Sequence, residues 1–177
     1  PGEGTRESPY QLETLSHLMG LAESVAAGND YEGCYFELTQ SLDLGGIAIN
    51  RGDWNPIGWY RSRAEMSGEV PTPFRGYFDG CGNTITGLKI AGELDGKTNL
   101  GLFGVIDGGS VENLEIQCDQ VRGLDQVGIL AGAVKNGAVI RNVTVSGYVY
   151  SRHNAGGIAA MLCGSGKGTL AGTQLQD

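Results

Sequence analysis

Two short stretches of this chain combine aromatic rings with arginine side chains, a combination suited to binding carbohydrate. The first contains Trp59 and Tyr60, followed closely by Arg61 and Arg63. Flat rings stack on the faces of sugar rings, while a guanidinium donates several hydrogen bonds in a fixed geometry. The stretch therefore predicts a carbohydrate platform. The alternative is that both rings pack a long loop onto the body of the protein, as we expect for the neighbouring Trp54.

The second stretch lies nearer the C-terminus and contains Tyr148, Tyr150, Arg152 and His153. Side chains alternate along a β-strand, so Tyr148 and Tyr150 are expected on one face. Together with Arg152 they predict a recognition strip at the edge of the fold. The alternative is an ordinary outward-facing pair whose polar ends lie in water.

No pair of carboxylates is placed for catalysis. Hydrolysis of a glycosidic bond needs two carboxyl groups about 5 to 10 Å apart across that bond. In the repeat described below, Glu115 aligns with Lys89 and Thr144, so no second acid stacks on it. Asp79 and Asp107 could meet around a turn, but Asp79 belongs to a turn-like Phe-Asp-Gly sequence. We therefore predict no catalytic residue and no enzymatic activity. A carbohydrate-active β-helix enzyme remains as a third hypothesis.

Metal, cofactor, nucleic-acid and membrane functions find no support in the sequence. The chain has no Cys-x-x-Cys, no HExxH and no glycine-rich phosphate loop before a helix, so we predict no metal and no cofactor. A net charge of −8 without a basic cluster disfavours nucleic acid and anionic membranes. No apolar run reaches the roughly 18 residues that would span a bilayer.

The four cysteines occupy different positions in the repeat and are not expected to stack on one another. We predict that they are buried free thiols, with a disulfide as the alternative if the protein is exported. They are Cys34, Cys81, Cys118 and Cys163.

The elements that must position these side chains repeat along the chain. Short apolar runs recur with Gly or Asn at their third position, at residues 87, 113, 142 and 172, in steps of 26, 29 and 30 residues. Glycine-led apolar runs recur at 99–104, 126–132 and 154–160. Such periods are typical of a solenoid, in which each coil buries its apolar face against its neighbours. With 31 glycines in 177 residues, many tight turns are expected between short strands.

Within these runs, apolar residues two positions apart are expected to stack into columns between coils. The third-position Asn or Gly suits a bend because both residues tolerate left-handed backbone conformation. The amides of stacked asparagines are also expected to hydrogen-bond from coil to coil. The predicted columns contain Leu88 with Ile90, Leu114 with Ile116, and Val143 with Val145.

The two ends of the solenoid are expected to differ. Residues 15–27 have apolar positions at helical spacing, with Thr14 as N-cap and Gly28 at the C-terminal end. This amphipathic helix is placed to cap the N-terminal end. No comparable cap follows the last coil, so either the natural chain continues or the edge self-associates there.

Several motifs together resemble bacterial cell-surface proteins that carry GLUG repeats. They are the run 31–38 after the helix, Ser-Leu-Asp-Leu at 41–44, Trp-Asn-Pro-Ile-Gly at 54–58, the segment 74–85, and Gly-Leu-Phe-Gly at 101–104 with looser copies at 128–132 and 156–160. The resemblance covers about residues 10–175. It implies a right-handed parallel β-helix on an exported protein of the kind found in adhesins and beside IgA-cleaving metalloprotease domains. Without HExxH the protease activity does not carry over.

The sequence thus predicts an all-β right-handed parallel β-helix with an N-terminal capping helix. Residues 1–9 are expected to be a flexible lead-in to a single domain at 10–177, divided into helix and first strands (10–44), a long loop (45–73) and repeated coils (74–177). The hypothesis for function is a non-catalytic extracellular module, part of a longer protein, that binds a host or dietary glycan or a host protein. The alternative is a structural spacer that presents another domain.

Overall fold

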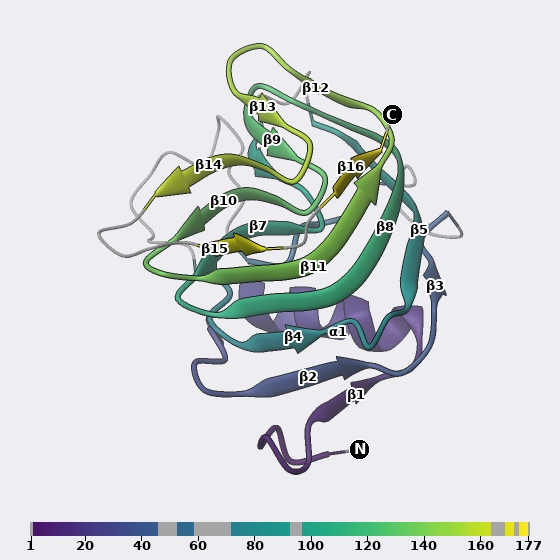
Figure 1. Cartoon of the computed structure of the whole chain (residues 1–177), viewed down its shortest axis with the longest axis vertical. Coiled ribbons are helices and arrows are strands. Elements are labelled where there is room, and N and C mark those ends of the chain that lie inside the picture. The colour runs from purple at the N-terminus through teal and green to yellow at the C-terminus, as the bar shows by residue number, and fades with distance from the viewer. Residues whose placement is uncertain are drawn as a thin grey trace.

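A computed structural model describes residues 2–45, 53–58, 72–92, 97–163, 169–171 and 174–176. In this part of the chain, parallel strands wind into a right-handed β-helix of about four turns, with one helix near the N-terminus (Figure 1). The predicted fold is confirmed. The predicted long loop at 45–73 falls mostly outside the described residues.

Three parallel sheets run along the solenoid. The largest, which we call the front sheet, faces the viewer in Figure 1 and bends along its strands. Its strands are β1 (Tyr10–Leu12), β2 (Tyr35–Leu38), β3 (Leu42–Asp43), β4 (Tyr77–Asp79), β5 (Thr84–Ala91), β8 (Ser110–Gly123), β11 (Val139–Ser146), β12 (Val149–Ser151), β15 (Thr169–Ala171) and β16 (Gln174–Gln176). The second sheet contains β6 (Thr98–Leu100), β9 (Asp125–Gly128) and β13 (Ala155–Gly156), and the third contains β7 (Phe103–Asp107), β10 (Ala131–Lys135) and β14 (Ala159–Cys163).

Helix α1 (Leu15–Ala26) lies between β1 and β2, within the first coil. The Oγ1 atom of Thr14 accepts a hydrogen bond from the backbone N–H of His17 at 3.2 Å, as an N-cap should. Gly28 has a φ of 108°, which suits the end of the helix. The buried face of α1 joins the core of the solenoid and consists of Leu18, Leu21, Ala22 and Val25.

The coils stack in a strict register. From β8 to β11 the step is 29 residues, since Ser110 lies opposite Val139, and from β11 to β15 it is 30. Leu114 and Ile116 lie opposite Val143 and Val145. All four are buried, which confirms those predicted columns.

The predicted step of 26 residues between Gly87 and Asn113 is wrong. Leu88 lies opposite Cys118 and Ile90 opposite Val121, in the second half of β8. The run at 85–90 has the same apolar spacing as the run at 111–116. Because β8 is 14 residues long, either half of it offers a matching apolar pattern for the run at 85–90. Periodicity therefore cannot show which half of the front strand a run belongs to.

The predicted bends at residues 87, 113 and 142 and the amide ladder are confirmed, whereas the fourth predicted bend, at residue 172, lies outside the described residues. Gly87, Asn113 and Asn142 have φ values of 68°, 52° and 51°, in the left-handed region. The Nδ2 of Asn142 donates to the Oδ1 of Asn113 at 3.0 Å, and the Nδ2 of Asn113 donates to the Oδ1 of Asp79 at 3.0 Å. The ladder therefore joins three successive coils.

The recurrent glycine-led runs form the corner between the second and third sheets. Gly101 and Gly128 are stacked at this corner, as are Gly128 and Gly156. A Cβ on Gly128 would lie 2.3 Å from the backbone oxygen of Ala131, closer than van der Waals contact allows. Glycine is required there because the backbone folds tightly against itself.

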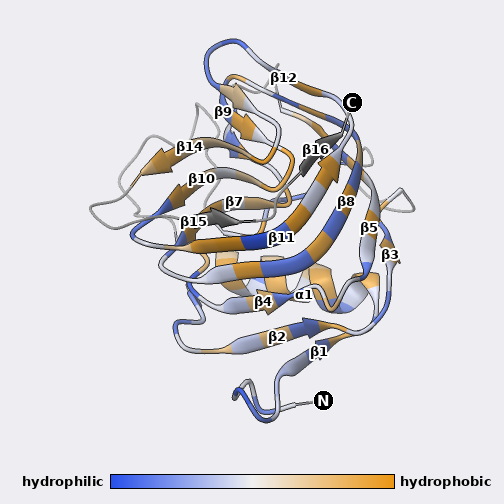
Figure 2. Ribbon diagram, viewed as in Figure 1, coloured by the Kyte–Doolittle hydropathy of each residue, from blue (hydrophilic) through white to orange (hydrophobic). Residues whose placement is uncertain are grey.

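Inward side chains stack coil upon coil to form the core. One column contains Phe36, Phe78, Val111 and Ile140, each less than 5% exposed. Figure 2 shows the resulting alternation of apolar and polar residues along β8 and β11.

The apolar layer is open at the last described coil. Val134 is 5% exposed, whereas Leu162, opposite it in β14, is 57% exposed. Ala133 is fully buried, but its neighbour Met161 is only half-buried. No element in the described part of the chain covers this end as α1 covers the other.

Candidate functional site: a groove on the front sheet

The outer face of the front sheet carries a column of aromatic side chains. Tyr35 in β2 lies opposite Tyr77 in β4, which lies opposite Ser110 in β8. The two rings are stacked, with centroids 4.6 Å apart and planes at 21°. Because Ser110 has no ring, Tyr77 has a single ring neighbour among the described residues. Tyr77 is 37% exposed and is therefore accessible to a ligand.

A column of acids runs beside these rings. Glu37, Asp79 and Glu112 lie opposite one another on β2, β4 and β8, and Arg141 follows on β11. Asp79 accepts the ladder hydrogen bond from Asn113, and Glu112 lies 3.3 Å from the guanidinium of Arg141. The Glu37 carboxylate makes no hydrogen bond or ion pair with any residue that the structure describes.

The two columns line a groove of about 450 Å³, which we call the front groove. This volume falls within the range of about 300–1,000 Å³ typical of ligand sites. The N-terminal segment supplies one wall, since Gly4 O accepts a hydrogen bond from Tyr35 N at 2.9 Å. The lining residues are Arg6, Pro9, Tyr35, Phe36, Glu37, Tyr77, Phe78, Asp79, Ser110 and Glu112.

The sequence-based alignment of Glu115 was half right. Glu115 lies opposite Thr84 and Thr144, whereas Lys89 lies opposite Gln120. The hydroxyl of Thr84 donates to the Glu115 carboxylate at 3.4 Å. No acid stacks on Glu115, as expected, but acids do stack three residues earlier along β8, where the shifted alignment concealed them.

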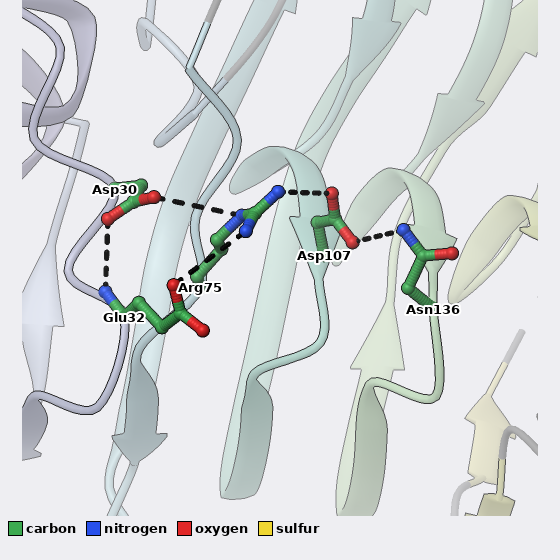
Figure 3. Close-up of polar contacts among 5 residues, drawn as sticks. All are labelled: Asp30, Glu32, Arg75, Asp107 and Asn136. Atoms are coloured by element: carbon green, nitrogen blue, oxygen red, sulfur yellow. Dashed lines mark hydrogen bonds and ion pairs between the residues drawn. The ribbon is translucent and has the colours of Figure 1, made fainter.

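Asp107, which could have met Asp79 around a turn, belongs to a separate cluster (Figure 3). The guanidinium of Arg75 lies 3.3 Å from Asp107, 3.7 Å from Asp30 and 3.8 Å from Glu32. Asp107 also accepts a hydrogen bond from Asn136 at 2.6 Å. The cluster joins turns of successive coils. Within the described residues, no group of acids, histidines and cysteines is arranged to hold a metal ion.

The first predicted platform, Trp59 and Tyr60 with Arg61 and Arg63, lies outside the described residues. Trp54 is 2% exposed, and its Nε1 donates to Leu102 O at 2.9 Å. The prediction that Trp54 anchors its loop onto the coils is confirmed.

The second predicted strip is only loosely assembled. Tyr148 precedes β12 and is 55% exposed. Tyr150 lies in β12 opposite Arg122, whose guanidinium carbon is 5.2 Å from the centre of the ring. Arg152 is exposed. No ring contact joins Tyr148 to Tyr150 in this part of the structure.

All four cysteines are free thiols. Cys118 is buried, as predicted, and Cys34 is half-buried, but Cys81 and Cys163 are exposed, so the prediction of burial was wrong for these two. Burial raises the pKa of Cys118 to about 12. Desolvation of its thiol and then the Asp79 carboxylate raise the pKa of Cys81 to about 11. Neither thiol is therefore activated as a nucleophile at neutral pH.

The front groove was missed although the sequence contains a signal for it. The tripeptides Tyr-Phe-Glu at 35–37 and Tyr-Phe-Asp at 77–79 have the same alternation of outward, inward and outward side chains. They are 42 residues apart, because this coil contains the long insertion between β3 and β4. A search for periods of 26–30 residues does not pair them.

The chain is similar to segments of much longer proteins. It is 34% identical over 158 residues to halomucin of Haloquadratum walsbyi, and this aligned segment covers 89% of this chain and 2% of halomucin. It is 36% identical over 148 residues to a protein of Evansella cellulosilytica named "Putative Gly-rich membrane protein", covering 81% of this chain and 15% of the relative. It is 33% identical over 122 residues to immunoglobulin A1 protease of Streptococcus pneumoniae, and this aligned segment covers 64% of this chain and 6% of the protease.

These similarities fit a surface repeat protein, in keeping with the predicted resemblance. No family model matches the chain, so the assignment to GLUG repeats itself stays a prediction. No solved structure matches it either. None of the helical residues that the structure describes form a segment long and apolar enough to cross a bilayer.

Proposed function

We propose that this chain is a non-catalytic module of an exported bacterial surface protein and that it binds saccharide in the front groove. The observation that carries the proposal is the accessible stack of Tyr35 and Tyr77 beside a row of carboxylates. An aromatic face takes the apolar side of a pyranose ring, and carboxylates accept hydrogen bonds from its hydroxyls. Surface location is supported by the relatives: one is named a membrane protein, and another is named for acting on an immunoglobulin.

The non-catalytic part of the proposal rests on how the acids are engaged and not on their spacing. A glycosidase needs two carboxyl groups about 5 to 10 Å apart that can act as acid and as base or nucleophile. Asp79 is held by Asn113, and Glu112 is paired with Arg141, which leaves Glu37 as the unengaged acid of the column. The role of the module in adhesion to a host or dietary glycan is part of the same proposal.

The open C-terminal coil supports a second property, edge-to-edge self-association. Leu162 exposes an apolar side chain on β14, whose outer edge has no partner strand in the described residues. Exposed apolar edge strands invite pairing with another chain.

Affinity electrophoresis through gels containing mucin, host and plant glycans tests the proposed binding. We expect retarded migration that is lost in Tyr77→Ala and kept in Tyr77→Phe. Gln117→Ala is the control, because Gln117 is an exposed, uncharged residue of β8 that does not line the groove. Unretarded migration on every polymer would favour the spacer or a protein ligand. Staining for loss of polymer would reveal an enzyme and overturn the non-catalytic part of the proposal.

A further inference from the structure

We propose that the front groove selects saccharides that carry free amino groups, such as glucosamine oligomers, over neutral and acidic ones. This inference rests on the proposed saccharide binding and names its ligand class. It comes from the position of one exposed ring face beside carboxylates in a groove of about 450 Å³.

The column of stacked rings ends at Tyr77, and a sugar ring of a ligand could be the next ring in it. Pro9 and Tyr35 lie toward the N-terminal side of Tyr77, and Ser110 lies on the other side. Ser110 is 7% exposed and carries no ring, so the next ring in the column beyond Tyr77 has to come from a ligand. The face of a tyrosine ring attracts both C–H groups and cations.

The charge of the groove distinguishes among sugars. Three carboxylates and one guanidinium, that of Arg6, line it. Glu37, whose carboxylate has no side-chain partner in the described part, lies diagonally across from Tyr77, because its register partner on β4 is Asp79. Diagonal neighbours of this kind are about 8 Å apart along the backbone, still within reach of aromatic and long side chains. An ammonium held near both groups gains from the ring and from the carboxylate. An acidic sugar would instead meet the excess of negative charge, on a chain whose net charge is −8.

The backbone geometry favours a saccharide over a basic peptide. β2 is hydrogen-bonded on both sides, to β1 and β4, and β4 is likewise paired with β2 and β8. An extended peptide therefore cannot add to the sheet at the groove through main-chain hydrogen bonds. The ligand must be recognised by side chains alone, which suits a stacked sugar ring.

The test is calorimetric titration of the whole chain with tetrasaccharides of glucosamine, N-acetylglucosamine and galacturonic acid, at about pH 6, where carboxylates are ionised and amines protonated. We expect the glucosamine oligomer to bind at least about fivefold more tightly than its acetylated form, the effect of one charge pair near 4 Å in water. Glu37→Gln should remove that preference and leave binding of the acetylated oligomer within about twofold. Tyr77→Ala should weaken both, and Gln117→Ala, at an exposed position outside the groove, should weaken neither.

The outcomes separate this inference from the function on which it rests. Equal or tighter binding of the acetylated or acidic oligomer would overturn the amino-sugar preference and leave saccharide binding standing. Absence of binding for all three would overturn both. A lysine tetrapeptide bound as tightly as the glucosamine oligomer would also overturn the choice of saccharide as ligand. Amide hydrogen exchange of each variant shows whether the coils remain folded, so that lost binding is assigned to the groove.

Discussion

Replacing Asn113 by alanine and, separately, by glycine measures two contributions of the amide ladder. Asn113 has a φ of 52°, donates to Asp79 at 3.0 Å and accepts from Asn142 at 3.0 Å. Both replacements remove the two side-chain hydrogen bonds, which together contribute about 1–3 kcal/mol. Only alanine also carries the strain of a left-handed backbone, about 1–2 kcal/mol. Glycine adopts that conformation freely but adds flexibility to the unfolded chain, about 0.5–1 kcal/mol.

We therefore expect Asn113→Ala to lower the free energy of unfolding by about 2–5 kcal/mol, and Asn113→Gly by about 1.5–4 kcal/mol. Urea unfolding, followed by far-ultraviolet circular dichroism, measures both values. The double variant with Asn142→Ala then shows how much of the loss belongs to the bond between the two amides. Equal losses for alanine and glycine would show that the strain of alanine in the left-handed bend is no larger than the flexibility cost of glycine. An unchanged midpoint for both would refute the stabilising role of the ladder.

The other predictions concern the turn cluster, the thiols and the corners. Arg75→Met should lower stability by about 1 kcal/mol because its ion pairs are partly exposed, and the loss should shrink in high salt; a loss independent of salt would contradict this. Because the pKa of Cys118 is raised in the folded protein, the thiol of the unfolded chain ionises first as the pH rises. The free energy of unfolding should therefore be unaffected by this thiol below about pH 9 and should fall between about pH 9 and about pH 12. Alkylation at pH 8 should spare Cys118 in the folded protein, and rapid labelling there would refute its protection. Gly128→Ala should cost about 3 kcal/mol or more because its Cβ would meet Ala131 O, whereas Gly20→Ala, in an open helical position, should stabilise by about 0.5–1 kcal/mol.

The repeat period does not predict the groove, because its residues come from coils of different length. Tyr35 and Tyr77 come from coils that differ in length, so no fixed period brings them together. The alignment of Gly87 with Asn113 then placed the acids of β8 opposite the wrong residues. Only the register of hydrogen bonds between strands shows which outward side chains are neighbours.

Sequence alone is enough to predict the solenoid, the amphipathic helix that begins at residue 15, the columns from Leu114 to Val145 and the left-handed bends. Each of these follows from local rules: apolar spacing, capping, and the backbone freedom of Gly and Asn. The register across the irregular coil, and with it the groove, its stacked rings and its acids, depends on the folded structure. Register depends on how whole coils pack against each other, and an insertion changes the sequence distance between neighbours without changing their distance in space.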